Sequence, residues 1–446
     1  MEFSESLYDE MLEWLFTRFP SYQRVGDRAF KPGLATMREF ISQLGEPQSA
    51  YGVIHIAGTN GKGSVSHMTA SALACCGMKV GLYTSPHLRD FRERMKIISK
   101  GATVCSYEMI SKEEVFAFME RYRDFLDTYN PSFFEITTAM AFDWFRSRGV
   151  DLAVIECGLG GRLDSTNVVT PLLSVITNIG LEHREYLGHT LEEIACEKAG
   201  IIKRGVPALI GERQPETSKV FEEIAAQVAS SGLFFAEELP LLLPLCPEEI
   251  ELKGDYQQRN LRTVSAIFSL LIGKGLLHVA DSGCDIEALS YGVSNAATFT
   301  GLHGRWETLR KRADLGGIAG KAPIICDTAH NAHAMRWVRE QIDKISCDYD
   351  NIFFILGVVA DKDVDGIVSY LPRDVNFILT NSEGERALPA AKLADRLSDH
   401  GINGRTSTSV KEALEMADSL AVEEDLIFIC GSNFVVAEAM EIVCSW

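Results

Sequence analysis

Short apolar runs recur along this chain, and each ends in glycine or in a residue with a hydroxyl, amide or imidazole group. In the first part of the chain the runs fall at residues 53–57, 80–84, 152–157, 173–179 and 208–210. Segments with helical periodicity separate most of them, at residues 64–76, 112–128, 135–148 and 190–199. This alternation of strand and helix predicts a largely parallel sheet with helices on both faces.

A second series of the same kind follows a stretch rich in glycine and threonine at residues 298–305, which we interpret as a linker. Its predicted strands lie at residues 322–326, 352–356, 376–379 and 426–429. Further helices are predicted at residues 4–16, 34–44, 259–274 and near 218–230. We therefore expect an α/β protein of two domains: a P-loop-type, mostly parallel ATP-binding domain over residues 1–304, then a smaller Rossmann-like domain over residues 305–446.

Composition excludes several classes of function. The net charge of −19 argues against nucleic acid as the main partner, because phosphate binding needs a basic face. No apolar run approaches the eighteen or so residues of a membrane span, and the acidic N-terminus does not resemble a signal peptide. The eleven cysteines are scattered over a long chain, which favours free, reduced thiols. We expect a cytoplasmic monomer that binds neither nucleic acid nor membrane.

The strongest motif is a glycine-rich turn between the apolar run at residues 53–57 and the helical segment that begins at Ser64. It reads Gly58-Thr59-Asn60-Gly61-Lys62-Gly63-Ser64-Val65. Glycines let backbone N–H groups approach a phosphate, Lys62 supplies a positive charge, and the following helix adds its dipole. The motif departs from the common phosphate loop, because Gly63 separates the lysine from the hydroxyl residue. We predict that this turn binds the phosphates of a nucleotide.

Polar residues also follow the neighbouring predicted strands. Ser85 follows the run at 80–84, Glu156 lies near the end of 152–157, and His183 comes shortly after 173–179. The carboxyl ends of parallel strands meet at one edge of a sheet, where ligands bind. Mg²⁺ prefers oxygen ligands, so Ser64 and Glu156 suit it, whereas His183 is a less usual ligand and could instead orient a water.

At this point the sequence resembles the folylpolyglutamate synthase and dihydrofolate synthase family, which belongs to the wider group of Mur-type ligases. The resemblance covers nearly the whole chain. It rests on the phosphate loop and on the segments YTSPHL (83–88), FFEITT (133–138), ECGLGGRLDSTN (156–167), TNI (177–179), LGHT (187–190), EKAGI (197–201), GR (304–305), DTAHN (327–331) and RALP (386–389). Two positions depart from the family pattern: Glu182 replaces an aspartate and Thr328 replaces a glycine.

The resemblance implies roles for residues at matching positions. The residues implied to contact ATP are Thr59, Asn60, Gly61, Lys62, Gly63, Ser64, Val65, Asn260, Arg305, Asp327 and His330. Those implied to hold metal are Ser64, Ser85, Glu156, His183 and, once carbamylated to give a carboxylate, Lys198. Those implied to lie near the pterin substrate are Phe133, Phe134, Glu135, Gly161, Arg162 and Asp164.

The implied cofactors are ATP and Mg²⁺ at two sites, with a requirement for K⁺ left open. The implied substrates are L-glutamate and either dihydropteroate or a reduced folate. We expect ATP to phosphorylate the pterin substrate's carboxylate, after which the amine of glutamate attacks the acyl phosphate. Catalysis would then depend on Lys62, Lys198, His183, Arg305 and the bound metal, which position the groups and neutralise charge. The second domain is expected to close over ATP, because water would hydrolyse the intermediate.

Two other functions stay open from the sequence. One is a cell-wall ligase of the Mur type, which the short segment before the phosphate loop disfavours. The other is a P-loop NTPase that acts as a switch or binding module and hydrolyses nucleotide without glutamate.

Overall fold

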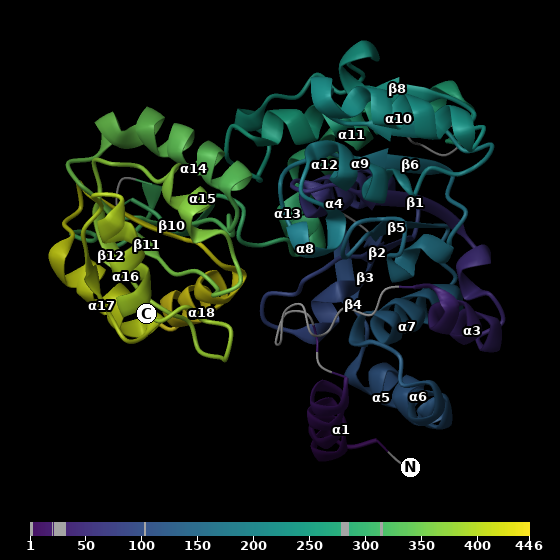
Figure 1. The fold of residues 1–446 in the computed structure, drawn as a ribbon, viewed down its shortest axis with the longest axis horizontal. Helices are drawn as coiled ribbons and strands as arrows, with labels where there is room; N and C mark the ends of the chain where they lie inside the picture. The colour runs from purple at the N-terminus through teal and green to yellow at the C-terminus, as the bar shows by residue number, and fades with distance from the viewer. Residues whose placement is uncertain (1–2, 20, 22–32, 102–103, 278–284, 313–314) are drawn as a thin grey trace. The chain divides into compact units, whose positions relative to one another are not determined.

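The chain folds into two compact units in this computed structural model, which describes residues 3–19, 21, 33–101, 104–277, 285–312 and 315–446. The first unit comprises Met1–Glu251 and Gln257–Leu302, and the second comprises Leu252–Tyr256 and His303–Trp446. The chain therefore passes between the units three times. Each unit is built from strands alternating with helices, which confirms the predicted α/β class (Figure 1).

An eight-stranded sheet forms the core of the first unit, in the order β4-β3-β2-β5-β1-β6-β7-β8. The strands are β1 (Gly52–Ala57), β2 (Val80–Tyr83), β3 (Met95–Lys100), β4 (Cys105–Met109), β5 (Leu152–Glu156), β6 (Leu173–Ile176), β7 (Ala208–Ile210) and β8 (Leu233–Phe235). From β2 to β8 in the sheet order all pairs are parallel, whereas β3 is antiparallel to β2 and β4. Strand β1 lies between β5 and β6, so the loops after these three strands leave one edge side by side.

Helices cover both faces of this sheet. They are α1 (Glu5–Arg18), α3 (Ala35–Gln43), α4 (Lys62–Cys75), α5 (Lys112–Arg121), α6 (Arg123–Tyr129), α7 (Phe133–Arg148), α8 (Arg184–Leu187), α9 (Leu191–Ala199), α10 (Pro215–Gln227), α11 (Gln257–Gly273), α12 (Ile286–Ser294) and α13 (Ala296–Thr300). Helix α4 packs against α11, α12 and α13 and is buried almost throughout. An aromatic-rich core, with Phe40, Phe142 and Phe145 fully buried, joins α1, α3, α5, α6 and α7 to the sheet. Burial of this apolar surface is the main stabilising contribution.

The second unit has a six-stranded sheet in the order β13-β12-β11-β14-β10-β9, in which only the β9–β10 pair is antiparallel. Its strands are β9 (Glu307–Arg310), β10 (Ile324–Cys326), β11 (Ile352–Leu356), β12 (Asn376–Leu379), β13 (Gly404–Thr406) and β14 (Leu426–Cys430). Its helices are α14 (Ala332–Ile345), α15 (Val364–Val368), α16 (Ala390–Asp399), α17 (Val410–Leu420) and α18 (Asn433–Cys444).

Several elements differ from the sequence prediction. The predicted linker at residues 298–305 is wrong in its first part, because α13 continues to Thr300 and remains within the first unit. The side chain of Lys96 caps this helix by donating to the carbonyl oxygens of Thr300 and Gly301, at 2.8 and 2.9 Å. The predicted helix at 112–128 is broken at Tyr122 into α5 and α6. The antiparallel hairpin β3–β4 was not predicted.

The sequence predicted free thiols and no membrane span, and the structure describes both the cysteines and the helices. Nine cysteines within the described ranges are free, and five of these are buried. Cys76 is disulfide-bonded, so the expectation of free thiols is wrong at that position. Every helix that the structure describes is too short or too polar to cross a lipid bilayer.

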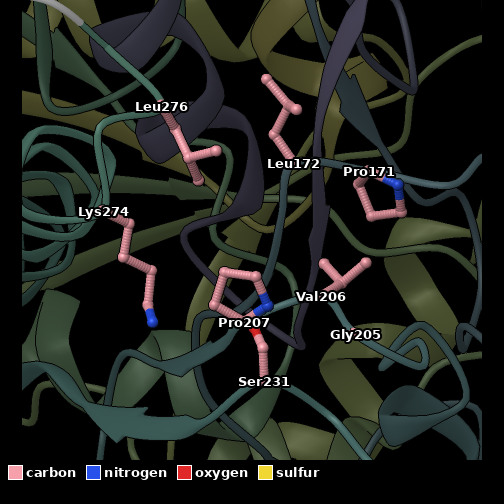
Figure 2. Close-up of a pocket in the computed structure, with 8 residues that line it drawn as sticks. All are labelled: Pro171, Leu172, Gly205, Val206, Pro207, Ser231, Lys274 and Leu276. Carbon is pink, nitrogen blue, oxygen red and sulfur yellow. The ribbon is translucent and has the colours of Figure 1, made fainter.

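A hollow of about 400 Å³ lies at the amino-terminal edge of the first sheet (Figure 2). The segments before β6, β7 and β8 contribute most of its lining, and Lys274 and Leu276 complete it from beyond α11. Ligand sites of parallel sheets lie at the opposite, carboxyl-terminal edge. The hollow is therefore separate from the polar site described next.

Candidate functional site

The glycine-rich turn leads from the end of β1 directly into α4, so that the helix begins at Lys62. Two of its glycines are required by geometry. Gly58 has φ +145°, and a Cβ there would overlap the hydroxyl of Thr177; Gly61 has φ +83°, and its Cβ would overlap the amide of Asn260. The turn is fixed to the loop after β6, because the Thr59 N–H donates to the Asn178 carbonyl oxygen at 2.9 Å. Its backbone is thus held in the conformation that suits an anion at a helix N-terminus.

Two lysine ammonium groups converge on one carbonyl of this turn. Lys62 donates to the carbonyl oxygens of Gly58 and Thr59 at 3.0 and 3.1 Å. Lys198, near the end of α9, donates to the same Gly58 oxygen at 2.8 Å. Burial, reinforced by the positive charge of Lys62, lowers the pKa of Lys198 to about 7. Lys198 therefore carries a large neutral fraction at neutral pH, unlike an exposed lysine.

Acidic and hydroxyl groups line the same edge of the sheet. Glu156 ends β5 as a buried carboxylate, and one of its oxygens accepts from the Ser85 N–H at 3.2 Å. Ser64 is buried in the first turn of α4. Glu182 lies near Lys198, since its charge acts to raise that pKa. Its carboxylate is 3.4 Å from Nε2 of His183, whose backbone is left-handed with φ 51°.

These groups suit a hard divalent cation better than a soft one. Across the described ranges, no three His, Cys, Asp or Glu side chains gather into a ready-made metal cluster. The predicted set of Ser64, Ser85, Glu156 and His183 contributes one carboxylate and two hydroxyls. Proteins in general bind Mg²⁺ through few protein oxygens, and waters and substrate phosphates complete its coordination.

The predicted pterin-contacting residues divide into two groups. The carboxylate of Glu135 accepts the Ser132 N–H at 2.6 Å and closes a capping box at the start of α7. The carboxylate of Asp164 is buried and accepts the N–H groups of Gly158 and Leu159 at 2.9 and 2.8 Å. Both carboxylates therefore hold their own loops in place.

Among the remaining predicted residues, only Phe134 and Arg162 leave side-chain surface for a ligand. Phe134 is partly buried and packs against Tyr83, with ring centroids 5.8 Å apart. Phe133 is buried and stacks on Phe16 at 5.5 Å. Arg162 is exposed and forms an ion pair with Glu197 at 2.8 Å. Gly161 lies where a Cβ would be 2.7 Å from the Lys198 carbonyl oxygen, so the loop packs closely against α9.

In the second unit, the loop after β10 holds the predicted residues Asp327 and His330. The buried Asp327 carboxylate accepts from the Tyr256 hydroxyl at 2.7 Å and from the N–H groups of Trp306 and Ala329 at 2.9 and 2.8 Å. Nδ1 of His330 is 2.9 Å from the Thr328 carbonyl oxygen.

Arg305 lies beside this loop. Its guanidinium donates to the Gly304 carbonyl oxygen at 3.1 Å and to the hydroxyl of Thr328. The threonine that departs from the family pattern thus helps to orient Arg305.

Comparison with known proteins decides the family. The model of the Mur ligase middle domain matches residues 56–233, and that of the Mur ligase glutamate ligase domain matches residues 304–433. A folylpolyglutamate synthase from Lacticaseibacillus casei is 31% identical over 456 residues, which cover 96% of this chain and 97% of that protein. The chain belongs to the folylpolyglutamate synthase/dihydrofolate synthase family.

Other members of the family extend this comparison. The solved structure of Escherichia coli FolC in complex with DHPP and ADP has a TM-score of 0.78 and 26% identity, over 98% of both chains. A probable bifunctional folylpolyglutamate synthase/dihydropteroate synthase from Haloferax volcanii is 31% identical over 92% of this chain and 48% of its own length. The chain therefore spans about half the length of such archaeal relatives.

The sequence did not single out two buried groups of this folylpolyglutamate synthase-type site. Arg94 is buried, donates to Nδ1 of His87 at 2.9 Å and lies 5.3 Å over the ring of Phe133. Burial lowers the pKa of Arg94, whereas the nearby Tyr83 and Glu156 act to raise it. The Thr166 hydroxyl donates to the Asp164 carboxylate, and its oxygen lies 2.8 Å from Nε2 of His55. The contacts of Arg94 with Phe133 and of Thr166 with His55 have no local signal in the sequence, because the partners come from separate segments of the chain.

Proposed function

We propose that this protein is an ATP- and Mg²⁺-dependent ligase that joins L-glutamate to the carboxylate of a pterin. The acceptor would be dihydropteroate, giving dihydrofolate, or a reduced folate that is extended by γ-glutamyl units. The observation that carries the proposal is the convergence of Lys62 and Lys198 on the Gly58 carbonyl, just after β1, whose neighbouring strand β5 ends in the buried Glu156. Relatives from Bacillus subtilis and Escherichia coli, matched over 94% and 91% of their length, are dihydrofolate synthase/folylpolyglutamate synthases, which supports both acceptors.

The chemistry requires activation, because a free carboxylate is not electrophilic at neutral pH. One oxygen of the substrate carboxylate attacks the terminal phosphorus of ATP and ADP leaves. The neutral amine of glutamate then attacks the carbonyl carbon, and the phosphate leaves with that carboxylate oxygen. The amide forms with the loss of one proton from the amine. Phosphoryl transfer of this kind depends on positioning and charge neutralisation.

The residues of the first unit have separate roles in this proposal. The turn formed by Thr59, Asn60, Gly61, Lys62, Gly63, Ser64 and Val65 binds the phosphates, and Asn260 supports it at Gly61. Ser64, Ser85, Glu156 and His183 hold Mg²⁺, which would neutralise the charge that develops on the phosphoryl oxygens. Phe133, Phe134, Gly161 and Arg162 form the pterin side of the site.

Two further roles concern Lys198 and the second unit. The low pKa of Lys198 supports carbamylation, since only a neutral amine reacts with CO₂. Arg305 and His330 contact the nucleotide in this proposal. We also propose a monomer in the cytoplasm; the nine free thiols support that location, whereas the disulfide at Cys76 does not.

The test is the release of phosphate from ATP–Mg²⁺ in matched reactions. Each pterin acceptor, dihydropteroate or tetrahydrofolate, is tested with glutamate and without glutamate. A third reaction contains glutamate and no acceptor. We expect sustained phosphate release only when acceptor and glutamate are both present, with one glutamyl adduct formed per phosphate. Equal release without glutamate would support an NTPase switch instead. Release only with a nucleotide-linked muramoyl acceptor would support a cell-wall ligase.

A further inference from the structure

Two loops of the first unit lie side by side at the carboxyl-terminal edge of its sheet. One follows β6 and comprises residues 177–180, and the other follows β7 and comprises residues 211–214. The Gly211 N–H still donates to the Ile176 carbonyl oxygen at 2.7 Å, directly after β7 has ended at Ile210. Backbone groups further along the loop after β6 therefore need partners other than a strand.

The side chain of Gln214 supplies both partners of one buried residue in that loop. Its Oε1 accepts the Ile179 N–H and its Nε2 donates to the Ile179 carbonyl oxygen, both at 2.8 Å. Ile179 is 1% exposed, and a buried peptide group that loses its hydrogen bond carries the cost of its desolvation. One amide thus takes the place of a paired strand at Ile179.

The same residue begins α10, but through its backbone. Gln214 is the N-cap residue, and its carbonyl oxygen accepts the N–H groups of Thr217 and Ser218 at 3.1 and 3.0 Å. The N-cap position favours Ser, Thr, Asp and Asn, whose short side chains accept a helix N–H. The longer side chain of Gln214 is directed to Ile179 instead, so it serves the loop after β6 and not its own helix.

The residues on either side of Ile179 hold the glycine-rich turn. Asn178 accepts the Thr59 N–H on its carbonyl oxygen at 2.9 Å and the Asn60 N–H on Oδ1 at 3.0 Å. Gly180 donates its N–H to the Thr59 hydroxyl oxygen at 2.9 Å. The residue that the amide holds therefore lies between two residues that hold the turn.

We propose that Gln214 is a positioning residue: its amide fixes the loop after β6, and that loop fixes the glycine-rich turn in the shape that binds ATP. Gln214 acts through Ile179 and contacts neither nucleotide nor metal in this proposal. The effect on ATP binding rests on the proposed function, whereas the linkage between the loop and the turn does not.

The first test uses two variants of Gln214 and a control. Gln214→Ala removes both hydrogen bonds, and Gln214→Asn keeps an amide that is one methylene shorter and suits the N-cap. Gln227→Ala is the matched control, because Gln227 is exposed at the other end of α10. Hydrogen–deuterium exchange is measured on peptides covering residues 57–64, 177–182 and 352–356.

In both Gln214 variants we expect exchange to rise at least about fivefold in the first two peptides and to stay unchanged in the third, which covers β11 of the second unit. The control should match wild type in all three. Wild-type exchange in the Gln214 variants, or a rise confined to residues 177–182, would overturn the proposal.

Nucleotide binding separates positioning from a general loss of stability. We expect both Gln214 variants to weaken binding of ADP–Mg²⁺ about tenfold by calorimetry and to raise KM for ATP by a similar factor, with kcat within about twofold. A merely less folded protein would lower kcat and keep the Kd of its folded fraction, and that result would contradict the proposal. If the wild type makes no glutamyl adduct, the proposed function fails, and the exchange and calorimetry still decide the linkage.

Discussion

Lys198 is the residue whose environment departs most from that of an ordinary lysine. It is 4% exposed, it donates to the Gly58 carbonyl oxygen, and its pKa is lowered to about 7 by burial and by Lys62. Below this pKa the ammonium form dominates and cannot react with CO₂. Above it the neutral amine would form the proposed carbamate and release a proton. The state of this side chain therefore changes within the physiological pH range.

Replacing Lys198 by alanine should lower turnover by about 10²- to 10³-fold, because the site loses a carboxylate-bearing group. Acetate or formate should restore part of the activity. Lys203→Ala is the matched control, since Lys203 also donates to a backbone carbonyl but lies outside the proposed site. Wild-type activity in Lys198→Ala would refute the role. Wild-type activity should also fall between pH 8 and pH 6 when CO₂ is limiting, whereas the acetate-rescued variant should lack that fall.

At the scale of single elements, the turn between β1 and α4 is under a tight geometric constraint. Gly58 combines a positive φ with a carbonyl that accepts from two lysines, and a Cβ would overlap Thr177. Gly58, which directly follows β1, therefore contacts both α4 and α9 through its carbonyl oxygen. The helix of the motif begins two residues earlier than predicted, at Lys62, which places the lysine in its first turn.

Gly58→Ala should destabilise the protein by about 1–3 kcal/mol, because the alanine would be strained at this φ. It should also weaken binding of ADP–Mg²⁺ at least about tenfold, since the turn cannot keep its shape. Gly273→Ala is the matched control, because Gly273 ends α11 with open space where the Cβ would be. Urea unfolding and calorimetry measure both effects. Equal behaviour of the two variants would show that the turn tolerates a side chain.

The central parallel strands could be predicted from the sequence because they are buried and read as apolar runs, whereas the short parallel strands β8 and β13 at the sheet edges were missed. Strand β13 is fully exposed and β4 mostly so, and neither has an apolar pattern to detect. The role of Glu135 was open to prediction, because Ser132-x-x-Glu135 matches a capping box. The partner of Asp327 was not, since Tyr256 lies 71 residues away in sequence.

At the scale of the whole molecule, the negative net charge repels the anionic ligands of the proposed reaction. The chain carries a net charge of −19, yet ATP, glutamate and the pterin acceptors are all anions. At physiological salt the long-range repulsion is screened beyond about 8 Å. In the proposed function, binding would therefore depend on short-range groups: the helix N-terminus, Lys62, Arg305 and Mg²⁺. This is why the composition argues against nucleic acid as the main partner but not against a nucleotide.

In the proposed function, the two units contribute different numbers of groups to the reaction. The first provides the phosphate turn, the metal-binding oxygens and the aromatic side of the site. The second provides Arg305 and the loop that orients it.

Transfer of oxygen from the substrate to phosphate is the most direct test of the proposed reaction. A pterin acceptor labelled with ¹⁸O in both oxygens of its reacting carboxylate is incubated with enzyme, ATP–Mg²⁺ and glutamate, and the released phosphate is analysed by mass spectrometry. An acyl phosphate predicts that each phosphate carries one ¹⁸O atom and that the amide retains the other. Phosphate without label would show that water, and not the carboxylate, attacks ATP, and would contradict the proposed function.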